Sequence, residues 1–147
     1  MIRKLREDDL GQIVAIESAT QVAPWTIKIF KDCLAASYPG WVIEHEGKVV
    51  CFAFIAMHLD ECHLLNLCVH PHSQRKGFGS ELLSYIIKNV KKNGAMMIYL
   101  EVRESNSHAI SLYKKLNFIQ IGTRKDYYPI IEGREDALVF ARDLGME

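Results

Sequence analysis

The sequence predicts a mixed α/β domain built around a single central sheet. Segments with the apolar spacing of helices alternate with segments rich in Val, Ile and Phe, which is typical of strands. The chain has 147 residues, enough for one domain with a hydrophobic core. No repeat, linker or low-complexity segment divides it, so we expect one domain over residues 1–147.

The first half of the chain is expected to hold a strand, two helices and a hairpin. Residues 1–6 fit a short strand, and Asp8 or Asp9 can cap the helix that follows. Thr26 can cap a second helix after the break at Pro24-Trp25. The hairpin is expected from strands at 41–45 and 48–57, joined by a tight turn at Glu46-Gly47.

The second half is expected to continue with a strand, a helix, a strand, a helix and two strands. Asn93-Gly94 can end the first of these helices, and Ser105 or Asn106 can cap the second. The strand between them is nearly continuous in apolar residues, which predicts a buried central position. The expected strands are 62–69, 96–103, one from Phe118 and one at 137–144; the expected helices follow Gly79 and Ser105, and Tyr127-Tyr128-Pro129 with Gly133 joins the last two strands.

Composition and charge exclude several classes of function. The 18 Lys and Arg residues balance 18 Asp and Glu residues, so no basic field favours a nucleic-acid partner. No apolar run approaches the roughly 18 residues that span a membrane, and the opening MIRKLREDDL lacks the apolar stretch of a secretory signal. We therefore expect a cytoplasmic protein with no membrane partner.

The cysteines favour neither a disulfide framework nor a metal site. Cys33, Cys51, Cys62 and Cys68 form no CxxC pair, and we expect them to be reduced and mostly buried. Cys62, Cys68 and His70 lie close together in the sequence, but the spacing C-x5-C-x-H is not that of a structural zinc site. We expect no metal.

The glycine-rich stretch Gln74 to Gly79 joins an expected strand to an expected helix. The first N–H groups of a helix have no internal partner, and the helix dipole makes that end positive. Gly77 and Gly79 expose the backbone, while Arg75 and Lys76 add positive charge. These features predict a diphosphate site, although a turn that binds nothing fits two glycines equally well. The stretch is neither a Walker loop nor a complete GxGxxG.

Residues 69–79 as a whole resemble the acetyl-CoA signature of the GNAT acetyltransferase superfamily, V-x-P-x-x-[QR]-x-x-G-x-[GA], with every fixed position filled. The resemblance extends to the order of elements over essentially the whole chain. It implies a GNAT-like single mixed sheet flanked by helices, with acetyl-CoA as the cosubstrate. By this resemblance the cofactor contacts are Gln74, Arg75, Lys76, Gly77, Gly79 and Ser80, with backbone groups of Leu67 and Val69 along the pantetheine arm.

A second informative run covers residues 100–118. A glutamate in an apolar strand, such as Glu101, is costly unless it is paired or functional; the alternatives are exposure to solvent or a pair with Arg103. Taken singly, Asn106 is a helix cap and Tyr113 a packing residue. Together they resemble the second GNAT signature, N-x-x-[AS]-x-x-x-Y followed by [GN]-F, with Asn117 where the family more often has glycine.

The resemblance assigns chemistry to these residues. Acetyl transfer needs a neutral amine, and a chain-terminal ammonium has a pKa of about 8, so a base must remove a proton. It implies Glu101 as that base, directly or through a water, Tyr113 as the acid that protonates the CoA thiolate, and Asn106 as a CoA contact. Residues 64–66 carry no carboxylate, which favours Glu101. Transfer is then direct, within a ternary complex.

The C-terminal segment, residues 124–137, indicates which kind of acetyltransferase to expect. Residues 124–129 and 133–137, RKDYYP and GREDA, resemble the bacterial N-terminal acetyltransferases of ribosomal proteins. This resemblance implies acetylation of the N-terminal alanine of a small-subunit ribosomal protein. It also implies that Trp25 and Tyr128 line the peptide channel and that Glu61, Glu135 and Asp136 attract basic residues. The alternatives are a GNAT enzyme acting on a small-molecule amine and a catalytically silent CoA-binding module.

Overall fold

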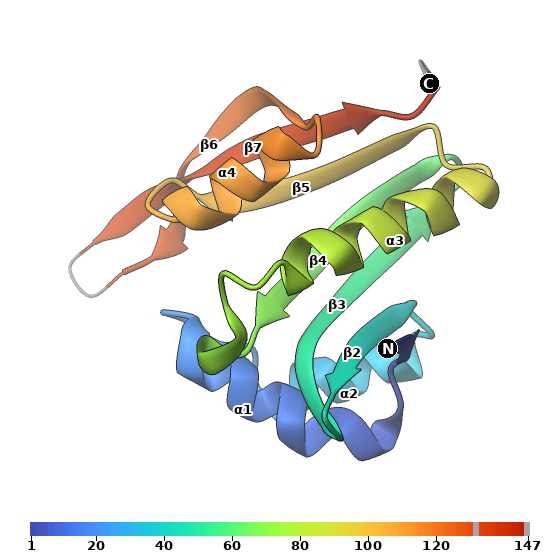
Figure 1. Ribbon diagram of the computed structural model, residues 1–147. Helices are drawn as coiled ribbons and strands as arrows, with labels where there is room; N and C mark the ends of the chain where they lie inside the picture. Colours follow the sequence, from blue (N-terminus) through green and yellow to red (C-terminus); the bar gives the residue numbers. More distant parts are fainter. Residues whose placement is uncertain (131–132, 146–147) are drawn as a thin grey trace. The chain divides into compact units, whose positions relative to one another are not determined.

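The computed structural model of the chain describes residues 1–130 and 133–145. Within these residues, seven strands form one mixed sheet in the order β1-β2-β3-β4-β5-β7-β6 (Figure 1). The predicted α/β architecture, a single sheet with flanking helices, is confirmed. The chain separates into two compact units: an N-terminal unit of residues 1–56 and 65–86, and a C-terminal unit of residues 57–64 and 87 onward.

The N-terminal unit contains the first three strands and the helices around them. β1 pairs antiparallel with β2, and β2 pairs antiparallel with β3. Glu46 and Gly47 both have positive φ, as the predicted tight turn between β2 and β3 requires. The elements are β1 (Ile2–Lys4), a short 3-10 helix (Glu7–Asp9), α1 (Leu10–Thr20), α2 (Ile27–Ala35), β2 (Gly40–His45), β3 (Lys48–His58), the end of β4 (Glu61–Val69), a second 3-10 helix (Pro71–Ser73) and the start of α3 (Phe78–Lys92).

The core of the N-terminal unit is centred on β3, whose residues 49–55 are all buried. Phe52 and Phe54 point to the face covered by α1 and α2, and both rings lie within 6.0 Å of the ring of Phe30. On the other face of the sheet, the ring of Trp41 contacts Tyr85 of α3 at 6.2 Å. Because successive side chains of a strand alternate between faces, helices on both sides keep residues 49–55 of β3 away from solvent.

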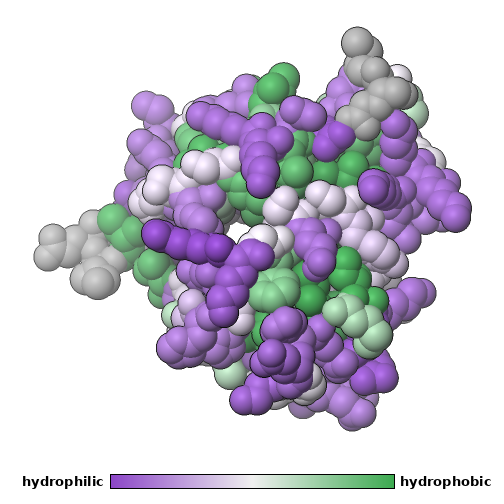
Figure 2. Space-filling model, viewed as in Figure 1, coloured by the Kyte–Doolittle hydropathy of each residue, from purple (hydrophilic) through white to green (hydrophobic). Residues whose placement is uncertain are grey.

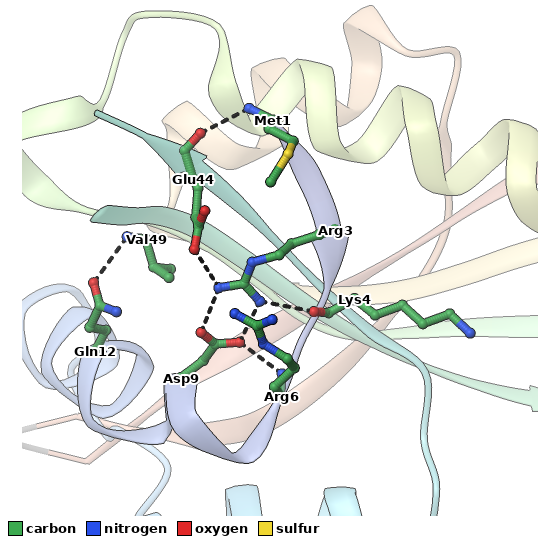
Figure 3. Close-up of polar contacts among 8 residues, drawn as sticks. All are labelled: Met1, Arg3, Lys4, Arg6, Asp9, Gln12, Glu44 and Val49. Carbon is green, nitrogen blue, oxygen red and sulfur yellow. Dashed lines mark hydrogen bonds and ion pairs between the residues drawn. The ribbon is translucent and has the colours of Figure 1, made fainter. Parts of the chain in front are cut away.

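An ion-pair network fixes β1 to β2 (Figure 3). The guanidinium of Arg3 donates to both carboxylate oxygens of Asp9, at 2.8 and 2.9 Å, and to Glu44 Oε1 at 2.7 Å. The amino group of Met1 donates to the carbonyl oxygen of Glu44 at 2.8 Å. The network therefore joins the chain start, the 3-10 helix and β2.

Asp9 is the centre of this network and is only 2% exposed. Burial alone would raise the pKa of Asp9, but hydrogen bonds from Arg3 and from the Arg6 N–H outweigh it, so the pKa lies below its ordinary value. Asp9 stands at the predicted cap position of α1, but its side chain makes no cap hydrogen bond there, because the carboxylate is turned back toward Arg3. Thr26, by contrast, caps α2 as predicted, accepting from the Ile29 N–H at 3.4 Å.

The C-terminal unit contains the first part of β4 and the strands β5, β6 and β7. The first part of β4 runs parallel to β5, pairing Glu61 with Met97, and β7 lies antiparallel to both β5 and β6. Asn106 caps α4 by accepting from the Ala109 N–H at 3.2 Å, and Gly94 with φ 96 follows the end of α3, both as predicted. The elements are β5 (Met97–Arg103), α4 (Ser107–Lys115), β6 (Ile119–Pro129) and β7 (Arg134–Asp143).

The two faces of β5 differ in character. Ile98, Leu100 and Val102 are buried, whereas the residues between them are only partly buried. The predicted central position is confirmed, because β5 lies between β4 and β7. Full burial is limited to alternate positions, and those between them include the polar Glu101. A correction concerns Tyr127-Tyr128-Pro129, which ends strand β6 instead of forming a hairpin loop.

The surface mixes polar and apolar groups. Figure 2 shows hydrophilic side chains over much of the viewed face, interrupted by hydrophobic patches. In the part of the chain that the structure describes, no helix is long and apolar enough to cross a membrane. All four cysteines are buried and unpaired by disulfides, as expected.

Candidate active site

The loop that follows β4 has a constrained backbone. The side-chain amide of Gln74 donates to the carbonyl oxygen of Val69 at 3.1 Å and so holds the loop against the strand end. Arg75 and Gly77 both adopt left-handed conformations, with φ 63 and 88. A Cβ on Gly77 would meet no atom within 4 Å, so glycine is required there by the backbone angle and not by crowding within the protein.

This loop leads into the start of α3, where the first backbone N–H groups have no partner within the helix. The first bond of the helix runs from the Glu81 N–H to the carbonyl oxygen of Gly77, at 2.9 Å. The amides of residues 77–80 therefore precede the helical ladder. Arg75 and Lys76 are exposed beside them. Helix-end amides next to two cations suit the pyrophosphate of acetyl-CoA, so the residues present fit this cosubstrate.

Other predicted residues of the N-terminal unit lie on β4 and between α1 and α2. Leu67 and Val69 are half-buried on β4. Trp25 is also half-buried, and the centre of its ring is 5.4 Å from that of Phe30. The backbone N–H of Trp25 donates to Glu17 Oε2 at 2.9 Å. Glu17 was not predicted as a site residue; its signal in the sequence is a carboxylate among the apolar residues of α1.

Glu101 lies on the less buried face of β5, with its side chain 28% exposed. Oε1 is 3.5 Å from Nε of Arg124, which corrects the alternative of a pair with Arg103. Oε2 is buried and has no hydrogen-bond partner among the described residues. A carboxylate oxygen without an internal donor is free to accept a proton from a substrate amine or a water.

Two tyrosines of β6 stand beside Glu101. The rings of Tyr127 and Tyr128 meet edge to face with centroids 5.0 Å apart. The guanidinium carbon of Arg103 lies 4.5 Å from the centre of the Tyr128 ring, and that of Arg124 lies 5.3 Å from the Tyr127 ring. Tyr128 was predicted as a site residue, whereas the two arginines that lie over the tyrosine rings were not.

The negative charge of Glu101 raises the pKa of both tyrosine hydroxyls, Tyr127 and Tyr128. It is the main cause that raises the pKa of Tyr127, together with partial burial. For Tyr128, burial first and then the charge of Glu101 raise the pKa to about 12. Both side chains are therefore neutral near pH 7.

A β-bulge positions these tyrosines. The register of β6 against β7 moves from Arg124↔Ala137 to Tyr128↔Glu135, so residues 125–127 lie opposite Asp136 alone. Asp126 has φ 52, and its N–H donates to Asp136 Oδ1 at 2.9 Å. Extra residues bend a strand and redirect its side chains. Asp136, expected to attract basic residues, is thus bonded within the bulge.

Glu135 forms a clamp with Arg103 and Ser105. Its Oε1 accepts from Arg103 at 3.1 Å and from the Ser105 hydroxyl at 3.0 Å, and its Oε2 accepts from the Ser105 N–H at 3.1 Å. Arg103 also donates to the carbonyl oxygen of Pro129 at 2.9 Å. Burial would raise the pKa of Glu135, but the bonds from Ser105 and Arg103 lower it overall. The clamp joins β5, β6, β7 and the segment before α4, and the predicted attraction of substrate by Glu135 stays a prediction.

Tyr113 is buried at 7% exposure, with its ring 5.8 Å from Phe118 and 6.4 Å from Phe140. Its predicted acid role and the CoA contact of Asn106 stay predictions. Glu61, also predicted, lies on β4 with Oε2 3.5 Å from Nε2 of His63. Among residues 1–130 and 133–145, no group of three or more His, Cys, Asp or Glu is placed to hold a metal.

Comparison with known proteins defines the class. The sequence model of the acetyltransferase (GNAT) family matches residues 2–118, and the chain belongs to this family. Family membership sets the reaction class as acetyl transfer, with acetyl-CoA as the cosubstrate.

Curated relatives share nearly the whole chain. It is 37% identical over 145 residues to the [ribosomal protein bS18]-alanine N-acetyltransferase of Escherichia coli K12, covering 99% of this chain and 98% of that protein. The Haemophilus influenzae protein of the same name is 34% identical over 142 residues, covering 96% and 97%. The crystal structure of the Escherichia coli ribosomal-protein-S18-alanine N-acetyltransferase matches with a TM-score of 0.92 over 98% of this chain and 93% of that chain, at 37% identity.

Proposed function

We propose that this protein transfers the acetyl group of acetyl-CoA to the N-terminal alanine of a small-subunit ribosomal protein, bS18 in the naming of its relatives. The support is the identity of 37% along almost the full length of both chains. The geometric observation that carries the proposal is Glu101 Oε2, a buried carboxylate oxygen with no partner among the described residues. It provides an acceptor for the proton of an N-terminal ammonium.

The first step of the proposed reaction is removal of that proton. Arg124 lies against Oε1 of Glu101, which leaves Oε2 to accept the proton directly or through a water. Tyr127 and Tyr128 keep neutral hydroxyls beside the carboxylate, so they offer hydrogen bonds without adding charge. The neutral amine then attacks the thioester carbonyl, polarised by a backbone N–H near Val69.

The second step is collapse to products. The new amide bond forms as the carbon–sulfur bond of the thioester breaks and the CoA thiolate leaves. The nitrogen loses its extra proton in this collapse, and that proton restores the Tyr113 hydroxyl once Tyr113 has protonated the thiolate. Tyr113 donates the proton that this thiolate requires, and no covalent enzyme intermediate forms. The amides of residues 77–80, with Arg75 and Lys76, hold the pyrophosphate, with Gln74 closing the loop, and Leu67, Val69 and Asn106 complete the contacts to CoA.

We assign the acceptor peptide to Trp25 and Tyr128, with Glu61 attracting basic residues beyond the N-terminus. Glu135 also bonds Arg103 and Ser105, so it has a structural role within the C-terminal unit besides any attraction of substrate. We place the reaction in the cytoplasm, where a ribosomal protein is available as substrate, and no nucleic-acid or membrane contact is required.

Two alternatives use the same fold. A GNAT enzyme of small-molecule amines would share the CoA loop and Glu101, but it would not need the tyrosine pair at the end of β6. A silent CoA-binding module would retain the loop without turnover.

Thiol release from acetyl-CoA against three acceptors tests the proposal. The acceptors are a peptide beginning Ala-Arg-Tyr with a free N-terminus, the same peptide blocked at its N-terminus and carrying an added lysine, and spermidine. Activity on the free N-terminus alone is the expected result. Activity on spermidine alone would move the chain to the small-molecule branch, and CoA binding without any turnover would favour the silent module.

A further inference from the structure

Glu17 is a buried carboxylate that the proposed reaction does not use. It lies on α1, one helical turn after Ile13, and is 2% exposed. Its Oε2 accepts from the backbone N–H of Trp25 at 2.9 Å, and its Oε1 accepts from the side-chain amide of Asn66 at 3.0 Å. A buried carboxylate is costly unless hydrogen bonds compensate for lost hydration, so these two donors hold it in one geometry.

The two bonds connect three separate segments of the N-terminal unit. Glu17 belongs to α1, Asn66 to β4, and Trp25 to the irregular segment that leads into α2. One turn further along α1, the Thr20 hydroxyl lies 2.8 Å from Sγ of Cys68, two residues after Asn66 on the same face of β4. These contacts fix α1 to β4. Because Glu17 also bonds the Trp25 N–H, the backbone of Trp25 is fixed relative to both elements.

The segment from Gln21 to Thr26 is bonded at its two ends: the Gln21 side-chain amide donates to Sγ of Cys68 at 3.6 Å, and Thr26 caps α2. Val22, Ala23 and Pro24 are exposed, and Trp25 is half-buried with its ring against Phe30. The ring contact is apolar and allows sliding, whereas a hydrogen bond from the Trp25 N–H to a buried carboxylate fixes the backbone direction.

We propose that Glu17 is a positioning residue for the acceptor site: its buried carboxylate, bonded to Asn66 of β4, holds the backbone of Trp25 in the orientation that receives the substrate peptide. The proposal rests on the proposed function in one respect, the assignment of Trp25 to the peptide site. Glu17 touches neither reacting group, so it acts on acceptor binding and not on the chemical step.

A structural readout tests the positioning by itself. The chain has two tryptophans, so Trp41→Phe leaves Trp25 as the fluorescent probe. In that background, Glu17→Ala is expected to shift Trp25 emission to longer wavelength and to increase its quenching by acrylamide. Asp9→Asn is the matched control, because Asp9 is equally buried but bonds Arg3 and Arg6 instead of Trp25. Unchanged quenching in Glu17→Ala, or an equal increase in Asp9→Asn, would overturn the positioning role whatever the activity.

Kinetics then tests the link to the acceptor. Loss of the hydrogen bonds to a charged group predicts that Glu17→Ala raises peptide KM by about tenfold. The KM for acetyl-CoA and the kcat at saturating peptide are expected to stay within about twofold, since an effect of this kind removes uniform binding. A loss of kcat with peptide KM unchanged would overturn the proposal. If the wild-type protein acetylates no N-terminal peptide, the proposed function fails, and the fluorescence comparison still decides the positioning role.

A rescue experiment separates geometry from general damage. Asn66→Asp places two carboxylates face to face and is expected to raise both Trp25 quenching and peptide KM. Glu17→Gln in the same chain supplies an amide N–H to the carboxylate introduced on β4 and a carbonyl oxygen to the Trp25 N–H, so the pair is again satisfied. We expect the double variant to recover toward wild type in both measurements. If the double variant shows stronger Trp25 quenching and a higher peptide KM than Asn66→Asp alone, the hydrogen bonds from Trp25 and Asn66 to Glu17 do not have the proposed role.

Discussion

Glu101 on β5 and Tyr113 on α4 lie beside neighbouring residues of β7. Glu101 is opposite Val139 in the strand register, whereas the ring of Tyr113 packs on Phe140, whose partner on β5 is Leu100. Neighbouring residues of a strand point to opposite faces, so Val139 and Phe140 face different ways and the proposed base and acid have different neighbours on β7. Each role can therefore be tested by itself.

Replacement of Glu101 by Gln is expected to lower kcat/KM for the peptide by about 10²-fold or more at pH 7, the usual effect of losing a general base. The deficit should shrink above pH 8, because the N-terminal amine has a pKa of about 8 and then loses its proton to solvent. The measurement is kcat/KM from pH 6 to 10, with Glu104→Gln as control because Glu104 is an exposed neighbour. Full activity of Glu101→Gln at every pH would exclude Glu101 as the base.

Tyr113→Phe removes the proposed acid but keeps the ring that packs on Phe118 and Phe140. We expect kcat to fall by about 10²-fold, since proton donation to the thiolate is lost. Tyr127→Phe is the control, because Tyr127 lies on β6 near Glu101 and has no assigned proton transfer. Single-turnover rates check both variants. A large loss in Tyr127→Phe with little loss in Tyr113→Phe would transfer the acid role to Tyr127.

The clamp between Arg103 and Glu135 is expected to stabilise the C-terminal unit. Both side chains are largely buried, at 12% and 15% exposure, and removal of one partner leaves the other charge unpaired. A double-mutant cycle of Arg103→Met and Glu135→Gln should give a coupling energy of about 1–2 kcal/mol in urea unfolding. The exposed pair of Lys28 and Asp32 is the comparison, with a coupling of about 0.5 kcal/mol or less. Additive effects at the clamp would show that the pair is not coupled.

Sequence patterns predicted the features that depend on local chemistry. Thr26 and Asn106 cap their helices because a short polar side chain before a helix has one favourable bond to make. Gly77 was predicted from its place before a helix, and its φ of 88 explains the choice of glycine.

The missed features depend on residues far apart in the chain. Asp9 turns away from its cap position because Arg3 and Glu44, which are 41 positions apart in the sequence, build a stronger network around it. The pairing of Glu101 with Arg124 needs the β6–β7 register and its bulge, and a register is not determined by the residues of one strand. Glu17 was missed because its donors, Trp25 and Asn66, come from two other segments.

The network around Asp9 predicts a specific loss of stability in acid. The pKa of Asp9 is lowered in the folded protein, whereas an unfolded aspartate has a pKa of about 3.9. A lowered folded-state pKa contributes stability that is present above the unfolded pKa and is lost as pH falls through the folded one. The free energy of unfolding of the wild type should therefore fall more steeply below about pH 4 than that of Asp9→Asn.

Urea unfolding between pH 3 and 6 measures this difference. Lys28→Ala, which removes only an exposed ion pair, is the control and should retain the wild-type slope. Parallel pH profiles for the wild type and Asp9→Asn would show that Asp9 titrates alike in the folded and unfolded chains.

Gly77→Ala tests the pyrophosphate site. At φ 88 an alanine is strained by about 1–2 kcal/mol, and its methyl group stands beside the amides proposed to hold the pyrophosphate. We expect the KM for acetyl-CoA to rise by about tenfold, which corresponds to the loss of one hydrogen bond to a charged group. The KM for acetyl-pantetheine, which lacks the pyrophosphate, should not change. Gly47→Ala is the control, because Gly47 has a similar φ of 78 and equally open surroundings in the β2–β3 turn. If Gly77→Ala raises both KM values equally, the mutation disturbs the site as a whole and the assignment of the pyrophosphate to this loop fails.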